Sequence, residues 1–136
     1  HGEAGSPPAP LPRGPARPRP LFQGAAPKVI VASFAPAPLH KLFDARHAEI
    51  VRCGLPSEWS DFRRYYAAIR KAGHYLSVGE LDPQLAALAA PIEKSEGGVW
   101  GAISLVLDTA RLAIVDTDRL AHLVKDAARR IGDRLA

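Results

Sequence analysis

The side chains that could do chemistry on their own are few and scattered. Cys53 is the one cysteine in the chain, so neither an internal disulfide nor a two-cysteine redox relay is predicted. His40, His47, His74 and His122 do not occur at metal-ligand spacing with cysteine or acidic partners. No metal site is therefore predicted. We expect Cys53 to be a small buried apolar residue and His40 and His47 to lie on the surface.

Two acidic residues, Glu80 and Asp82, are spaced like a pair of catalytic carboxylates. They lie in a Gly-Glu-Leu-Asp-Pro stretch, whose composition favours turn chemistry instead. The chain has no Gly-x-Ser-x-Gly motif and no phosphate-binding glycine loop, and Gly97-Gly98 is typical of a hairpin turn. The sequence therefore predicts no catalytic set and no cofactor, and the protein is not expected to be an enzyme.

Composition supports one globular domain. Hydrophobic residues make up 47% of the 136 residues and charged residues 24%, which is the usual balance of a globular protein. No apolar run reaches the ~18–20 residues that a membrane helix needs. The polar, proline-rich start does not resemble a secretory signal. These features, with the lone cysteine, predict a cytoplasmic protein that has no membrane partner.

The first twenty residues differ from the rest of the chain. They hold seven prolines and three arginines, Arg13, Arg17 and Arg19, opposed by Glu3. Proline removes backbone donors and fixes φ, so residues 1–20 are predicted to be an extended or disordered arm. The arm is interpreted as solvated, with contact to acidic partners or nucleic acid as the alternative. The remainder is close to neutral and carries no evident DNA-reading surface.

An ordered domain is predicted over residues 21–136, beginning with helices. Gly24–Phe34 opens with small residues and a proline, which predicts a helix that Pro36 and Pro38 close. One or two short helices are expected over Leu39–Cys53.

A longer helix follows, with Ser57 as its expected N-cap and Gly73 as its end. Its apolar residues recur at helical spacing and predict one buried face, made of Trp59, Phe62, Tyr66 and Ile69.

Strands are predicted after Gly73, where the period of the pattern changes. His74–Gly79, Leu85–Ile92 and Val99–Leu107 are predicted strands, and Arg111–Val115 is a further short candidate. A final helix capped by Asp116 or Thr117 is predicted to cover the sheet with an apolar stripe of Leu120, Leu123, Val124, Ala127, Ile131 and Leu135. The order of these elements indicates an α/β (α+β) sandwich with a mainly antiparallel sheet.

Several short motifs in this order resemble the effector-binding domain of the IclR family of bacterial transcription regulators. That family reads "PLH-x-GA-x-GK", "IR-x-x-GY", "GE", "(I/L)AAP(V/I)" and "GA-x-S-(I/L/V)" followed by an arginine. The matching segments are Pro20–Lys28, Ile69–Tyr75, Gly79–Leu81, Leu88–Ile92, and Gly101–Leu105 with Arg111. The resemblance covers about Pro20 to Leu135.

This resemblance implies a GAF-like fold, a curved antiparallel sheet with helices on both faces. The chain departs from the family pattern in three ways. No helix-turn-helix is visible, the proline-rich arm stands where the family has extra strands, and the "GY" motif is shifted to Gly73-His74-Tyr75. DNA is therefore expected as a partner only through a helix-turn-helix domain that this chain does not contain.

The resemblance also implies a ligand pocket between the sheet and the helix that starts at the "GA" motif. Carried over position by position, the pocket residues are Ala25, Ala26, Ser77, Leu85, Ala87, Ser104 and Val106. Ala25 and Ala26 lie at a helix start, where free N–H groups can bind a carboxylate. Leu85, Ala87 and Val106 are apolar, so a small, partly apolar carboxylic acid, for example an aromatic one, is the expected ligand.

The function predicted from the sequence is a small-molecule sensor that forms a homodimer or homotetramer. Three alternatives stay open at this point. One is an oligomerisation module with no ligand, and another is nucleic-acid binding through the basic arm. The third is a GAF-like enzyme such as a sulfoxide reductase, against which the lone cysteine argues.

Overall fold

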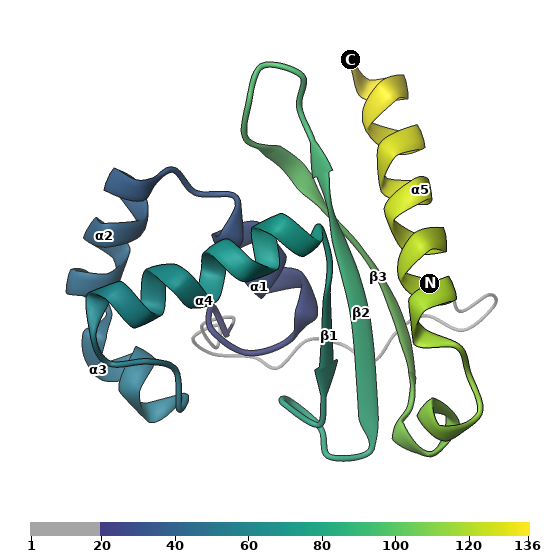
Figure 1. Cartoon of the computed structure of the whole chain (residues 1–136), viewed down its shortest axis with the longest axis horizontal. Helices are drawn as coiled ribbons and strands as arrows, with labels where there is room; N and C mark the ends of the chain where they lie inside the picture. The colour runs from purple at the N-terminus through teal and green to yellow at the C-terminus, as the bar shows by residue number, and fades with distance from the viewer. Residues whose placement is uncertain (1–19) are drawn as a thin grey trace, which may run out of the picture.

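The computed structural model describes residues 20–136, and the predicted arm lies outside this part of the chain except for Pro20. A three-stranded sheet separates four α-helices on one side from one α-helix on the other (Figure 1). The elements in chain order are α1 (Ala25–Ala32), α2 (Pro36–Ala45), α3 (His47–Arg52), α4 (Trp59–Ala72), β1 (Tyr75–Val78), β2 (Leu85–Glu93), β3 (Val99–Asp108), the 3₁₀ helix η1 (Thr109–Ala113) and α5 (Thr117–Leu135). The predicted fold class, a GAF-like antiparallel sheet with helices on both faces, is confirmed.

The sheet is antiparallel throughout, in the order β1-β2-β3. Ser77 pairs with Ala87, and Ala87 pairs with Val106, so one row of side chains crosses all three strands. Gly97 and Gly98 have φ values of 102° and 78°, which side chains disfavour, and they form the predicted turn between β2 and β3. The three main predicted strands are therefore confirmed.

The larger core lies between the sheet and α1 and α4. Phe62, Tyr66 and Ile69 of α4 are buried and Trp59 is half-buried, as their helical spacing predicted. The aromatic side chains pack closely, and the rings of Phe62 and Tyr66 lie at a tilt with 5.0 Å between their centres. Gly73 has a φ of 77° and ends α4 in the left-handed conformation that favours glycine.

On the opposite face of the sheet, α5 buries small residues. The residues that face the strands are Ala121, Val124, Ala128 and Gly132. A Cβ atom at Gly132 would lie 3.0 Å from the carbonyl oxygen of Glu93, so the helix and β2 approach too closely there for a large side chain. The predicted apolar stripe was therefore wrong in part, because three of its members are exposed, Leu123, Ile131 and Leu135.

Three smaller predictions were also wrong. Arg111–Val115 is no strand, because the chain turns into η1 directly after β3 and Ile114 is exposed with no strand beside it. The N-cap of α4 is Glu58 and not Ser57. Pro36 occupies the first turn of α2, where its missing N–H costs little, so it opens this helix rather than closing α1.

Candidate ligand-binding site

The strand residues predicted to bind a ligand lie on one face of the sheet. Directly paired residues in an antiparallel sheet point to the same face, and so do residues two apart on one strand. The register therefore puts Ser77, Leu85, Ala87, Ser104 and Val106 together. Ala87 packs against the core that includes α1, so this is the face that α1 covers.

Helix α1 covers this face only in part. Ala25 and Ser77 are buried, and Ala26 and Ala87 are half-buried. Ser104 is exposed, and Leu85 and Val106 keep 39% and 58% of their surface exposed. The predicted residues thus form a surface that is closed near the start of α1 and open toward β3.

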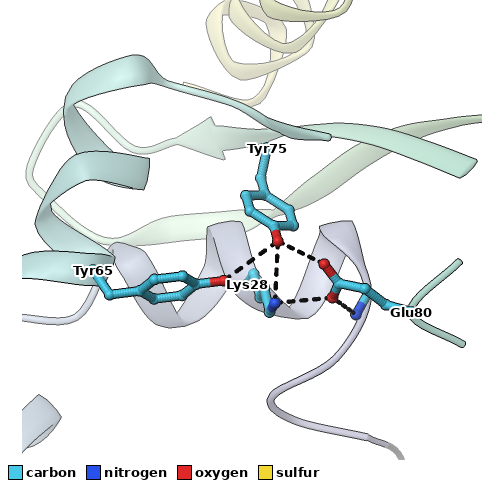
Figure 2. Close-up of polar contacts among 5 residues, drawn as sticks. Lys28, Tyr65, Tyr75 and Glu80 are labelled. Carbon is cyan, nitrogen blue, oxygen red and sulfur yellow. Dashed lines mark hydrogen bonds and ion pairs between the residues drawn. The ribbon is translucent and has the colours of Figure 1, made fainter. Parts of the chain in front are cut away.

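Four polar side chains meet beside the start of α1 (Figure 2). The Nζ of Lys28 lies 2.9 Å from Oε1 of Glu80, and it also donates a hydrogen bond to the Tyr75 hydroxyl at 3.2 Å. Tyr75 in turn donates to Oε2 of Glu80 at 2.6 Å and accepts from the Tyr65 hydroxyl at 3.3 Å. The backbone N–H of Gly24 donates to Oε1 of Glu80 at 2.9 Å. We call Lys28, Tyr65, Tyr75 and Glu80 the polar cluster.

The polar cluster holds Glu80 as an anion. Burial by itself raises the pKa of this carboxyl, but hydrogen bonds from Tyr75, Lys28 and the Gly24 N–H, together with the charge of Lys28, lower it below its usual range. Burial and the hydrogen bond to Glu80 raise the pKa of Tyr75, so its hydroxyl stays a proton donor. The cluster is therefore an ion pair bridged by a neutral phenol.

The prediction that Glu80 and Asp82 serve turn chemistry was right for Asp82 alone. Oδ1 of Asp82 accepts a hydrogen bond from the Gln84 N–H at 2.9 Å, as in an Asx turn. Glu80 instead accepts a hydrogen bond from the backbone N–H of Gly24, which is distant in sequence. The start of α1 thus already holds one carboxylate, and the N–H groups of Ala25 and Ala26 follow it in the first turn.

A cavity of about 500 Å³ opens at the other end of α1. Its apolar floor includes Val29 and Ile69, and its rim includes the charged residues Arg70, Lys125 and Arg129. None of the seven residues predicted from the family resemblance lines it. No local sequence pattern indicates this cavity, because its walls come from α1, α4, the β2–β3 hairpin and α5.

The remaining candidate residues serve packing. Cys53 packs against the core but is half-buried, so the prediction of a small buried apolar residue was right in part. His40 and His47 are exposed, as predicted, and the ring of His40 stacks on Trp59 with 4.1 Å between ring centres.

Within residues 20–136, no group of three or more potential metal ligands comes together. In the same part of the chain, no helix is long and apolar enough to span a bilayer.

Comparison with protein families gives a match over most of the chain. The family described as "Bacterial transcriptional regulator IclR C-terminal" matches residues 16–133. The chain belongs to this family, and it is the effector-binding domain of an IclR-type regulator. A search of curated proteins finds no match.

Solved structures of such regulators share the fold. The transcriptional regulator YaiJ is 24% identical with a TM-score of 0.72, over 90% of this chain and 73% of that one. The IclR regulator from Alicyclobacillus acidocaldarius is 18% identical with a TM-score of 0.65, over 93% of this chain and 52% of that one. The inducer-binding domain of PobR from Acinetobacter, a double mutant in complex with 3-hydroxybenzoic acid, is 16% identical with a TM-score of 0.64, over 83% of this chain and 65% of that one.

Proposed function

We propose that this domain senses a small, partly apolar carboxylic acid on the sheet face beside the start of α1. The observation that carries the proposal is the gathering of Ser77, Leu85, Ala87, Ser104 and Val106 on the face that α1 partly covers. Ala25 and Ala26 begin the helix at the covered end of this face. The set combines an apolar floor with two hydroxyl groups, which suits a ligand that has both an apolar body and polar ends.

The charge near the start of α1 permits a carboxylate there. Glu80 is negative, but the Nζ of Lys28 lies 2.9 Å away and balances its charge. A ligand carboxylate would then meet the N–H groups of the first turn and no net opposing charge. The PobR domain, which shares this fold, is complexed with an aromatic carboxylic acid, and this supports the same ligand class.

The ligand would act by changing the balance between assembly states. A compound that binds one arrangement of a homodimer or homotetramer better than another shifts the population toward it. In the complete regulator, that shift would alter DNA binding by a helix-turn-helix domain. On this reading the domain binds its ligand without converting it, in the cytoplasm.

An oligomerisation module with no ligand is the second candidate. It is favoured by the exposure of Leu85 and Val106 and by the carboxylate of Glu80, which already occupies the start of α1. The two candidates differ in whether any carboxylic acid stabilises the folded domain.

A thermal-shift titration against aliphatic and aromatic carboxylates tests the proposal. Selective binding to the folded state raises the free energy of unfolding by RT ln(1 + [L]/Kd), about 2.7 kcal/mol at a ligand concentration of 100 Kd, and this raises the melting temperature. We expect saturable stabilisation that Ser104→Ala weakens and Ala87→Leu abolishes by filling the covered end of the face. Ala67→Leu, at an exposed position on α4, is the matched control. A well-folded wild type that no carboxylate stabilises would favour the oligomerisation module.

A further inference from the structure

The cavity at the far end of α1 lies beside the part of β2 that β1 does not reach. β1 begins at Tyr75, which pairs with Ala89, so β2 continues beyond the start of its neighbour. Figure 1 shows the β2–β3 hairpin and the end of α5 at this same end of the sheet. Ala90, Pro91 and Glu93 of β2 line the cavity, whose volume is about 500 Å³. This volume lies within the ~300–1,000 Å³ of small-molecule sites.

Two close contacts fix helix α5 as a wall of the cavity. The Nζ of Lys125 donates a hydrogen bond of 2.9 Å to the carbonyl of Ala72, at the end of α4. Gly132 lies against the backbone of Glu93, where a Cβ atom would come within 3.0 Å of the carbonyl oxygen. α5 is therefore held against α4 and against β2, and both Lys125 and Gly132 line the cavity.

The floor of the cavity is apolar. It is formed by Val29 and Ala32 of α1 and by Ile69 of α4, all of which are buried members of the larger core. The apolar end of a ligand would be shielded from water here, which favours its binding.

The charged residues around the cavity have an excess of positive charge. Four are cationic and two are acidic, which leaves an excess of two: Arg70, Lys94, Lys125, Arg129, Glu93 and Asp133. Lys125 also offsets the negative C-terminal end of α4 through its bond to Ala72. Arg70 and Arg129 are exposed, and Arg70 forms no ion pair within the described part of the chain. The rim therefore suits an anionic group.

An added peptide strand fits this place poorly. The N–H of Gly79 donates to the carbonyl of Leu85, so the odd-numbered residues of β2 direct their backbone groups toward the β1 side. Beyond Ala89, the next such residue is Pro91, which has no N–H to donate to another strand. The cavity is thus better suited to a small molecule than to a strand.

We propose that this cavity binds a soluble amphiphilic phosphate monoester, with its apolar body on the floor and its phosphate among the cations of the rim. A phosphate monoester carries a charge of about −1.5 to −2 at pH 7, which matches the positive excess. Arg70 and Arg129 can each donate paired hydrogen bonds to phosphate oxygens. The apolar end must enter first, which a lipid held in a bilayer would oppose.

This site goes beyond the proposed carboxylate sensing, because none of the seven residues assigned to that function lines the cavity. Isothermal titration calorimetry of the full chain with octyl phosphate, below its micelle concentration, tests it. We expect saturable binding. 1-Octanol lacks the charge and inorganic phosphate lacks the apolar body, so each should bind at least about tenfold more weakly.

Five variants locate the bound probe. Arg70→Gln and Arg129→Gln should each raise the Kd of octyl phosphate about tenfold, because each removes charged hydrogen bonds. Ser33→Phe places a large ring at a half-buried position in the cavity wall and should abolish binding. Arg63→Gln is the matched control, since Arg63 is exposed on α4 away from the cavity. Ala87→Leu, on the sheet face, should leave binding unchanged, so a failed carboxylate titration does not affect this test.

Circular dichroism confirms that each variant is folded. The proposal is overturned by a wild type that shows no saturable binding, or by 1-octanol that binds as tightly as octyl phosphate. It is also overturned if Arg63→Gln weakens binding as much as Arg70→Gln does. Loss of binding in Ala87→Leu but not in the folded cavity variants would place the probe on the sheet face instead.

Discussion

Lys28 and Glu80 form the most deeply buried ion pair described in residues 20–136, and removing either charge should destabilise the fold. The side chains are 6% and 20% exposed, respectively. Lys28→Met keeps the length of the buried chain and removes the ammonium. Glu80→Gln keeps the shape of the carboxyl and removes its charge. Both substitutions thus change electrostatics with little change in packing.

The expected magnitudes follow from what each variant leaves behind. Breaking a fully buried pair costs about 3–5 kcal/mol, because the remaining charge has no partner. Lys28→Met leaves Glu80 partly exposed with two donors, Tyr75 and the Gly24 N–H, so we expect the low end, about 2–3 kcal/mol. Glu80→Gln leaves the buried ammonium with neutral acceptors alone, the Tyr75 hydroxyl and the new amide oxygen, so we expect about 3–4 kcal/mol. The double variant should cost about 2 kcal/mol less than the sum of the two.

Urea unfolding followed by circular dichroism measures these free energies. Lys71→Met, at an exposed position on α4, controls for the loss of a lysine and should stay within about 0.5 kcal/mol of the wild type. If Lys28→Met behaved like this control, or if the two charge removals were strictly additive, the ion pair would not stabilise the fold as argued.

Two further predictions concern the pH dependence and a buried hydroxyl. The pKa of Glu80 is lowered in the folded state. The charge of Glu80 therefore stabilises the fold above its unfolded pKa of about 4.3, and this stabilisation is lost as the pH falls through the folded value. The difference in free energy of unfolding between wild type and Glu80→Gln, measured by urea unfolding, should stay constant from neutral pH to about 5 and become smaller below that. The Tyr66 hydroxyl is buried with no hydrogen-bond partner in residues 20–136, so Tyr66→Phe should be neutral or stabilise the fold by up to about 1 kcal/mol. Tyr75→Phe removes a hydrogen bond to Glu80 and should destabilise the fold by about 1–2 kcal/mol. A large drop in the melting temperature of Tyr66→Phe would contradict this assignment.

The elements of the fold were predictable where local chemistry decides them. Gly73 and the pair Gly97-Gly98 have positive φ values that only glycine adopts easily, so the sequence marks where α4 ends and where β2 turns into β3. The aromatic spacing of α4 likewise predicted which side chains are buried. Arg111–Val115 was wrongly predicted to be a strand, because its β-branched residues suit a strand. The segment follows the end of β3, where no neighbouring strand lies beside it.

The surfaces between elements were harder to predict, because they depend on how closely distant segments approach. Hydropathy assigned the largest apolar residues of α5 to the sheet, yet the close approach at Gly132 admits only small ones. The role of Glu80 depends on Gly24, 56 residues away in the chain. No local sequence pattern indicates that two segments so far apart in the chain come together. The family motifs "GK", "GY" and "GE" nevertheless each contribute one member of the polar cluster, Lys28, Tyr75 and Glu80, respectively.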